Sequence, residues 1–307
     1  MRTLSALPPL ILPLLAVLTA CASGGGGAGA GLPVRIEKIA KAAGKERGVA
    51  VAYLKTGTGA AYSREADRRI HPASTMKVPV MLALFAAVDR GEMRLDQPVA
   101  VQNRFHSIVD GSIYTLDPAE DGDPDLYKSE GQSLPLEELI RRMIVRSSNL
   151  ATNILIDRIG ATRVTDLMRQ LGAEDLRVLR GVEDQKAYDA GLNNVTTARD
   201  LLIVLRALLP EAEESPWTPA SREKMLDILR AQEFNEKIPA GLPPGTKVAH
   251  KTGDITAIHH DAAIVFPEGE APYILVVLTA GFADEAEADR TIAEISRTVW
   301  AGRGERP

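Results

Sequence analysis

An α/β fold combined with an all-α domain is predicted by the order of strands and helices along this chain. Strand-like runs occur towards both ends of the 307 residues, and helical periodicity fills the middle. Antiparallel strands from the two ends can complete one sheet, and the terminal helices can pack on it. We therefore expect an α/β domain made of residues 33–73 and 215–307, with residues 74–214 inserted as a helical domain.

The N-terminal part of the α/β layer is expected to begin with a helix and a hairpin. Residues 34–43 show helical periodicity, and residues 48–54 form a β-rich run. A Gly-Thr-Gly turn then leads to a second short strand at residues 60–62. A nearly continuous apolar helix follows at residues 74–90 and ends at Gly91, a residue type that commonly follows helix ends.

Helices dominate the middle of the chain, and loops rich in Asp, Gly and Pro separate them. The most prominent of these loops covers residues 108–133. Apolar periodicity marks the helices that we expect at residues 136–146, 149–159, 163–171, 197–209 and 219–231.

The C-terminal part returns to the α/β layer. We expect strands at residues 247–252, 259–266 and 273–281, with a hairpin turn at residues 267–272 between the last two. Residues 284–300 have the periodicity of a final amphipathic helix.

The first twenty residues are typical of an export signal. Their apolar run, residues 4–18, contains three prolines and is too short for a membrane-spanning helix. The sequence Leu-Thr-Ala-Cys that ends at Cys21 resembles a bacterial lipobox. We expect residues 1–20 to be a lipoprotein signal peptide, Cys21 to carry the lipid, and residues 21–32 to be a glycine-rich tether. The mature protein would then be an exported lipoprotein, periplasmic or on the cell surface; an ordinary signal with a chance cysteine stays the alternative.

Charge and composition exclude some classes of function. The net charge of −5 and the absence of a basic stripe argue against nucleic acid as a partner, and aromatic residues make up only 4% of the chain. Because Cys21 is the only cysteine, no disulfide can form within the chain. We expect a monomer.

Three short motifs follow one another in the folded part. Ser74 and Lys77 lie one helical turn apart at the start of the apolar helix, Ser-Ser-Asn begins at Ser147 between two helices, and Lys-Thr-Gly begins at Lys251 at the end of a strand. A serine becomes a good nucleophile when a nearby base takes its proton, and a buried lysine can be that base. Second copies of two motifs, at Ser221 and Lys55, are interpreted as a helix start and a turn.

This ordered set resembles the motifs of the penicillin-recognising serine hydrolases, which include the β-lactamases and the penicillin-binding proteins. The resemblance covers most of the chain after residue 33. Glu183 follows Ser147 by 36 residues, about where class A β-lactamases carry a catalytic glutamate on a surface loop. The resemblance implies an α/β sandwich with an all-α domain, and hydrolysis of a β-lactam without a metal or other cofactor.

The resemblance also implies catalytic roles. Ser74 is the expected nucleophile, and its backbone N–H forms the oxyanion hole together with that of Asp254. Lys77 is one candidate for the acylation base, and Glu183 acting through water is the other. Ser147 would relay a proton to the leaving nitrogen, and Glu183 would activate the water that hydrolyses the acyl-enzyme.

Further residues are expected to bind substrate. Lys251 and Thr252 would bind the carboxylate that penicillins carry. Gly253 would leave room for substrate beside the strand edge, and Asn149 would hold the substrate amide.

Three positions depart from the class A pattern. Ser148 stands where an aspartate is usual, in a role that is mainly structural. Ala187 stands where an asparagine usually holds the hydrolytic water, a task that Asn193 or Asn194 could take over. The carboxylate of Asp254 would repel penicillin unless it points away. These departures put deacylation and substrate choice in doubt more than acylation.

A metal site is not expected. The His-His-Asp sequence at residues 259–261 offers metal-binding side chains, but no other histidine forms a typical zinc motif with it. It is interpreted as the beginning of a strand.

The sequence therefore predicts a serine hydrolase of the class A β-lactamase type that works through an acyl-Ser74 intermediate on a small β-lactam or a peptidoglycan-like substrate. One alternative is a cell-wall DD-peptidase or esterase of the same fold, which would not depend on Glu183. Another is a penicillin-binding lipoprotein without turnover.

Overall fold

The computed structural model describes residues 31–210 and 215–305, and the chain from Gly31 onward forms one compact unit. The predicted signal peptide, the lipid anchor at Cys21 and most of the tether lie outside the described residues. Among the described residues, none of the helices has both the length and the apolar character that crossing a membrane requires.

A five-stranded antiparallel sheet forms the centre of the fold, with the strand order β2-β1-β9-β8-β7. Its strands are β1 (Gly48–Lys55), β2 (Ala61–Arg64), β7 (Lys247–Ile255), β8 (Ile258–Phe266) and β9 (Tyr273–Ala280). β1 pairs with β9 along its whole length, so strands from both ends of the chain complete one sheet. The predicted fold class is thereby confirmed.

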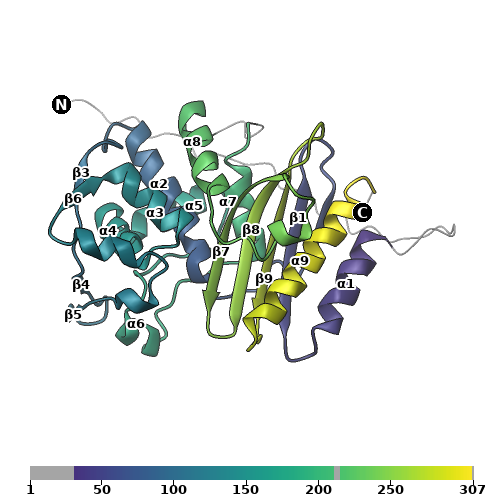
Figure 1. The fold of residues 1–307 in the computed structure, drawn as a ribbon, viewed down its shortest axis with the longest axis horizontal. Helices are drawn as coiled ribbons and strands as arrows, with labels where there is room; N and C mark the ends of the chain where they lie inside the picture. Colours follow the sequence, from purple (N-terminus) through teal and green to yellow (C-terminus); the bar gives the residue numbers. More distant parts are fainter. Residues whose placement is uncertain (1–30, 211–214, 306–307) are drawn as a thin grey trace, which may run out of the picture. The chain divides into compact units, whose positions relative to one another are not determined.

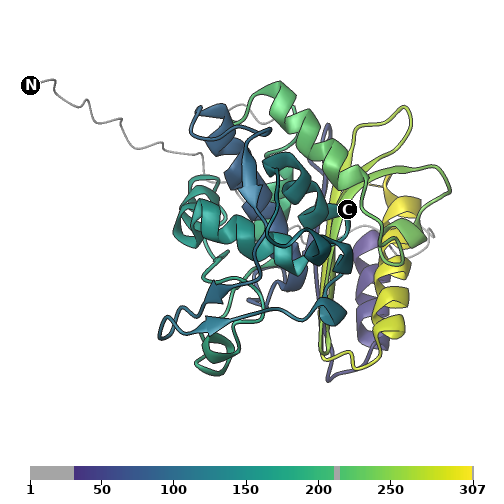
Figure 2. The same cartoon turned by 60° about the vertical axis from the view of Figure 1, so that its left-hand side comes forward.

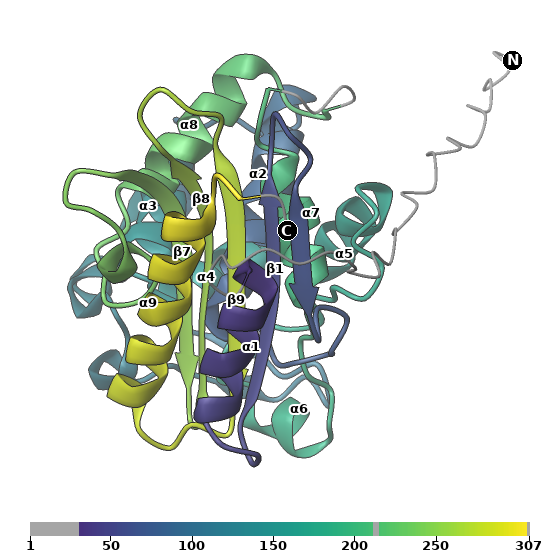
Figure 3. The same ribbon diagram turned by 90° about the vertical axis from the view of Figure 1, so that its right-hand side faces the viewer.

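Helices cover both faces of this sheet. α1 (Leu32–Ala42) and α9 (Glu285–Gly302) lie on one face, in front of the strands in Figure 3, and α7 (Ala198–Arg206) packs on the other. The side chains of β9 alternate accordingly: Leu275 and Val277 pack towards α1 and α9, whereas Ile274 and Val276 belong to the larger core. Each fully buried side chain of this kind contributes about 1.5–3 kcal/mol.

The other helices lie on the α7 side, to the left of the sheet in Figure 1. They are α2 (Lys77–Asp89), α3 (Leu136–Val145), α4 (Asn149–Ile159), α5 (Ala161–Gln170), α6 (Gln185–Asp189) and α8 (Pro219–Arg230). All but α6 agree closely with the expected ranges. The division of the chain at residues 74 and 214 stays a prediction; α7, which falls between them, packs on the sheet.

The apolar helix is buried on every side. All residues from Lys77 to Ala87 are buried, as expected for a helix that carries apolar side chains all round. Its start differs from the prediction, because residues 73–76 form a separate 3₁₀ turn, η1 (Ala73–Met76), before α2 begins. This turn packs against β7 and β8, so Ser74 lies next to the sheet.

The segment expected as a loop at residues 108–133 contains regular structure. Two short pairings involve it, β3 (Pro98–Ala100) with β6 (Ser133–Pro135) and β4 (Phe105–His106) with β5 (Ile113–Tyr114), and it holds the 3₁₀ helices η2 (Pro118–Glu120) and η3 (Pro124–Ser129). A further 3₁₀ helix, η4 (Pro239–Gly241), precedes β7. Strands of two or three residues leave too little periodicity to be recognised in a sequence. The β4–β5 hairpin extends from the helical part in Figure 2.

Candidate active site

Lys77 lies at the centre of the candidate site. As the first residue of α2 it is fully buried, and its ammonium donates to Ser147 O (2.6 Å), Ser147 Oγ (3.2 Å) and Asn149 Oδ1 (2.9 Å). These acceptors would use all three N–H groups of an ammonium, whereas a neutral amine has two N–H groups and a free lone pair. Burial holds the pKa of Lys77 well below its usual value, and the nearby charge of Lys251 lowers it further. A buried, low-pKa lysine is suited to accept a proton.

Ser147 receives hydrogen bonds from two lysines. Its Oγ accepts from Lys77 Nζ at 3.2 Å and from Lys251 Nζ at 3.0 Å. A hydroxyl has two lone pairs, so its own O–H is left to donate to a third group. The backbone here has φ +58°, a left-handed conformation that costs a non-glycine residue about 1–3 kcal/mol. The surrounding contacts hold Ser147 in this strained conformation.

Lys251 is the second buried cation. It comes from β7, is fully buried, and donates to Ser147 Oγ and to the carbonyl of Thr252 at 2.9 Å. Burial lowers the pKa of Lys251 to about 7, although the charges of Asp254 and Asp261 work against this effect. Its charge therefore changes near neutral pH.

Ser74 precedes Lys77 by three residues but makes no hydrogen bond to it in this structure. It is half-buried in η1, and its Oγ makes no hydrogen bond to any of the described residues. Gly253 explains how close β7 comes: a Cβ placed there would lie 2.8 Å from Ser74 N and 2.9 Å from Thr75 N. Only glycine permits this approach. The stretch of β7 backbone that leads into Asp254 therefore lies near the Ser74 amide. The expected oxyanion hole stays a prediction.

Glu183 is connected to Lys77 through a single amide. Asn149 accepts from Lys77 Nζ at 2.9 Å and donates its Nδ2 to Glu183 Oε1, also at 2.9 Å. The Glu183 side chain stays accessible to solvent, and its backbone has φ +62°. Partial burial raises the pKa of Glu183 above its usual value, although the Asn149 donor opposes the shift. The amide expected to hold substrate therefore also bridges the two candidate bases.

The loop around Glu183 is held by two residues that the sequence did not indicate. Asn153 of α4 exchanges hydrogen bonds with the backbone of Val182, at 2.7 and 3.0 Å. Asp184, nearly fully buried, accepts from Ser107 Oγ at 2.8 Å and from Ile108 N at 2.9 Å, which ties the loop to the β4–β5 hairpin. An amide within the apolar run of α4 was the one available signal.

The expected substitutes for the water-binding asparagine both use their side-chain oxygens within the loop. Asn194 Oδ1 accepts from the backbone of Leu179 and Arg180, and its Nδ2 donates to Arg180 O. Asn193 Oδ1 accepts from the Arg180 guanidinium at 2.8 Å. Ala187 is buried in α6. Both asparagine side chains thus support the loop.

The carboxylate of Asp254 is balanced by a cation. Its Oδ1 lies 3.0 Å from Lys237 Nζ and 2.9 Å from His259 Nδ1, and Lys237 also contacts Asp289 at 3.0 Å. Burial lowers the pKa of Lys237, but the two aspartates outweigh it and leave the pKa above its usual value. The repulsion expected from Asp254 is therefore opposed by Lys237.

The side chains at residues 259–261 point to different partners. His259 contacts Asp254, His260 contacts the carbonyl of His71 at 2.9 Å, and Asp261 contacts His250 at 3.1 Å. Asp254, His259 and Glu285 place ligand atoms within 4.8 Å of one another. The ammonium of Lys237 already occupies the shared Asp254 oxygen and would repel a metal ion.

The second copies of the motifs have structural roles. Ser221 Oγ donates to Asp89 at 2.7 Å near the start of α8, and Lys55 pairs with Glu270 at 2.9 Å at the end of β1. Both lie outside the group formed by Lys77, Ser147 and Lys251.

Comparisons with known proteins extend this description. A family model described as the beta-lactamase enzyme family matches residues 32–302. A beta-lactamase of Streptomyces fradiae is 28% identical, over 92% of this chain and 90% of its own. An imipenem-hydrolyzing beta-lactamase of Enterobacter cloacae is also 28% identical, over 81% of this chain and 82% of its own.

Solved structures are similar over most of the chain. An ancestral class A beta-lactamase has a TM-score of 0.75 at 29% identity, with 88% of this chain and 99% of that one covered. A PBP-A mutant, solved as an acyl-enzyme complex with penicillin G, has a TM-score of 0.75 at 26% identity, with 89% and 96% covered.

Proposed function

Because this chain belongs to the beta-lactamase enzyme family, we propose that it is a class A serine hydrolase that opens the β-lactam ring through an ester on Ser74. The observation that carries the proposal is the convergence of two buried lysines on the hydroxyl of Ser147, one of which, Lys77, follows Ser74 by three residues. This arrangement leaves the Ser147 proton available for a leaving group. Structures of class A enzymes with the same fold support the assignment.

Acylation begins with attack of Ser74 Oγ on the ring carbonyl. A base takes the serine proton, the new C–O bond forms, and charge develops on the carbonyl oxygen. Backbone N–H groups of Ser74 and Asp254 would stabilise that oxygen. The ring C–N bond then breaks, Ser147 donates its proton to the nitrogen, and a neighbouring lysine returns a proton to Ser147.

Two groups remain candidates for the base. The lowered pKa of Lys77 favours a neutral amine that could accept the proton directly. Glu183 could accept it through a water molecule, since Asn149 connects its carboxylate to the same cluster. In both routes the proton that leaves Ser74 is held by Lys77, Ser147 or Glu183.

Deacylation requires a water molecule. Glu183 would take a proton from this water as it attacks the ester, and Ser74 would recover its hydrogen as the acid product leaves. The raised pKa of Glu183 makes it a stronger base than an ordinary carboxylate. Substrate would be held by Lys251 and Thr252 at its carboxylate and by Asn149 at its side-chain amide.

Turnover of a chromogenic cephalosporin and labelling by a fluorescent penicillin test this proposal. We expect the purified protein to hydrolyse the cephalosporin and Glu183→Gln to retain the penicillin label on Ser74. A protein that shows neither turnover nor label would contradict the proposal.

A peptidase or a penicillin-binding protein without turnover is the second candidate. The observation that favours it is the environment of Glu183. Ala187 has no side-chain amide that could hold water, and the side chains of Asn193 and Asn194 are engaged with the loop. Such a protein would retain a stable label without any substitution. Release of D-alanine from a D-Ala-D-Ala peptide would then distinguish the peptidase from the binding protein.

Export and lipidation form a separate part of the proposal, supported by the sequence that ends at Cys21. We expect the mature protein to begin with a diacylated or triacylated Cys21 and to be a monomer at a bacterial membrane. Mass spectrometry of the mature N-terminus tests the anchor, and an unmodified first residue other than Cys21 would refute it. Light scattering tests the monomer.

A further inference from the structure

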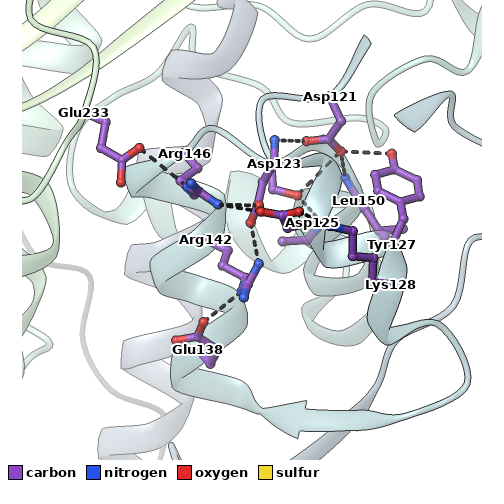
Figure 4. Close-up of polar contacts among 12 residues, drawn as sticks. Asp121, Asp123, Asp125, Tyr127, Lys128, Glu138, Arg142, Arg146, Leu150 and Glu233 are labelled. Carbon is purple, nitrogen blue, oxygen red and sulfur yellow. Dashed lines mark hydrogen bonds and ion pairs between the residues drawn. The ribbon is translucent and has the colours of Figure 1, made fainter. Parts of the chain in front are cut away.

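A buried carboxylate lies next to Ser148, the residue that departs from the usual aspartate. Asp121 Oδ2 accepts from Leu150 N at 2.8 Å and from the Tyr127 hydroxyl at 2.9 Å, and Ser148 Oγ lies 3.5 Å away. Asp121 is 7% exposed. Figure 4 shows its carboxylate directed at the backbone of Leu150. A carboxylate therefore lies beside Ser148, although it comes from a residue 27 positions earlier in the chain.

The next two residues fit against the same turn. A Cβ on Gly122 would lie 2.2 Å from Arg146 O, so only glycine allows this approach. Asp123 is fully buried and pairs with Arg142 at 2.7 Å and with Arg146 at 2.9 Å, as Figure 4 shows. Together, residues 121–123 contact the turn at its first residue, Arg146, and at its last residue, Leu150.

This turn carries two residues of the candidate site. Ser147 precedes α4 in a strained conformation, and Asn149 is the first residue of that helix. Leu150 N is one of the helix N-terminal amides that lack a partner within the helix, and a carboxylate there is also favoured by the helix dipole. The negative charge of Asp121 reaches the site as well, where it partly opposes the lowering of the Lys77 pKa and adds to the raised pKa of Glu183.

We propose that Asp121 is a positioning residue, which supplies from another part of the chain the carboxylate that holds Ser147 and Asn149 in place for acylation of Ser74. The acylation part of this statement rests on the proposed function. The structural part, the bond to the Leu150 amide, does not. Asp121 acts through the turn, since its hydrogen bonds among the described residues go to Asp123 N, Tyr127, Ser148 and Leu150 N.

Moving the carboxylate back to position 148 is the sharpest test. The variants are Asp121→Ala, Asp121→Asn, Ser148→Asp and the double variant Asp121→Ala with Ser148→Asp. Asp96→Asn is the matched control, because it removes an exposed carboxylate that pairs with Arg94 rather than with the turn. Acylation by a fluorescent penicillin is timed by stopped flow, and hydrogen exchange of the Leu150 amide is followed by NMR.

We expect Asp121→Ala to acylate about 10- to 100-fold more slowly, the effect typical of leaving a buried donor without its partner. Asp121→Asn keeps an acceptor and should lose less. Ser148→Asp alone should also slow acylation, since it crowds two carboxylates. The double variant should recover most of the lost rate and of the protection of the Leu150 amide, while Asp96→Asn behaves as the wild type.

Two outcomes would overturn the proposal. One is wild-type acylation together with a protected Leu150 amide in Asp121→Ala. The other is a double variant that melts at the wild-type temperature yet acylates no faster than Asp121→Ala. Where Asp121→Ala does not fold, Asp121→Asn and the double variant decide. If the wild type itself is not acylated, the proposed function fails, and exchange of the Leu150 amide alone decides the role of Asp121.

Discussion

The two halves of the candidate site are built in different ways. The acylation half consists of Lys77, Ser147 and Lys251, and its two lysines are fully buried and hydrogen-bonded to the one serine. The deacylation half is Glu183 on an irregular loop, accessible to solvent and held at its carboxylate by Asn149. The first is supported by a helix and a strand of the core, and the second by a few loop contacts.

This difference teaches that the two chemical steps need not respond alike to change. Removing a partner from a buried charged group is costly, because the remaining group loses both water and its hydrogen bond. A loop held by a few side chains can shift without unfolding the core. We therefore expect substitutions in the first half to affect whether Ser74 reacts, and substitutions in the second half to affect how long the ester lasts.

The largest effect is expected from Lys77→Met, which keeps the volume of the side chain and removes its amine. Acylation should slow by about 10²–10⁴-fold, as is usual when a general base is lost. Stopped-flow labelling with a fluorescent penicillin measures this rate. Lys55→Met is the control, since Lys55 belongs to the second Lys-Thr-Gly sequence. Acylation at the wild-type rate in Lys77→Met would contradict the assignment of Lys77 to the acylation half of the site.

Glu183→Gln should act on the other step. We expect deacylation to slow by about 10²–10⁴-fold, because the base for water is lost, with a smaller change in acylation. Single-turnover kinetics with an isolated acyl-enzyme separate the two rates. An equal loss in both rates would instead identify Glu183 as the base for acylation too, and the two halves would then not be independent.

Asp184→Asn should loosen the loop without removing a catalytic group. Asp184 accepts from Ser107 and Ile108, so its loss releases Glu183 from the β4–β5 hairpin. We expect deacylation to slow by about tenfold, the size typical of one lost buried charged hydrogen bond, and acylation to stay unchanged. Asp189→Asn, on the exposed end of α6, is a suitable control. Slower acylation in Asp184→Asn would show that the hairpin supports both halves.

The smallest expected effect is on the pH dependence of deacylation. The pKa of Glu183 is raised from 4.5 by partial burial, so its basic form disappears as pH falls through a value above 4.5. As the pH is lowered, the deacylation rate should therefore fall at a higher pH than it would with an ordinary glutamate. Rates of ester hydrolysis between pH 4 and 8 test this, and an acid limb at or below 4.5 would contradict it.

Much of the architecture is predictable from local pattern. The central strands and the helix at residues 77–89 follow from nearly continuous apolar runs, which burial in the core requires. Lys77, Ser147 and Lys251 of the ordered motifs meet in the structure, and their catalytic roles stay predictions. Gly253 was expected to leave room for a substrate, and the structure shows that it makes room for the backbone of Ser74 and Thr75.

The supporting contacts could not be predicted in the same way. Asp121, Asn153 and Asp184 each bind a group between 29 and 77 residues away, and nothing local specifies which partner they choose. The pairing of Asp254 with Lys237 depends likewise on how the segment before β7 folds back. Such partners are determined by tertiary structure, whereas the motifs are determined by short spacing.

Intact-mass and peptide mass spectrometry after brief mixing with penicillin G test the central claim most directly. The account predicts one penicilloyl group on Ser74 that disappears from the wild-type protein and remains on Glu183→Gln. A wild-type protein and a Glu183→Gln variant that both stay unmodified, or that carry the group on a residue other than Ser74, would contradict it.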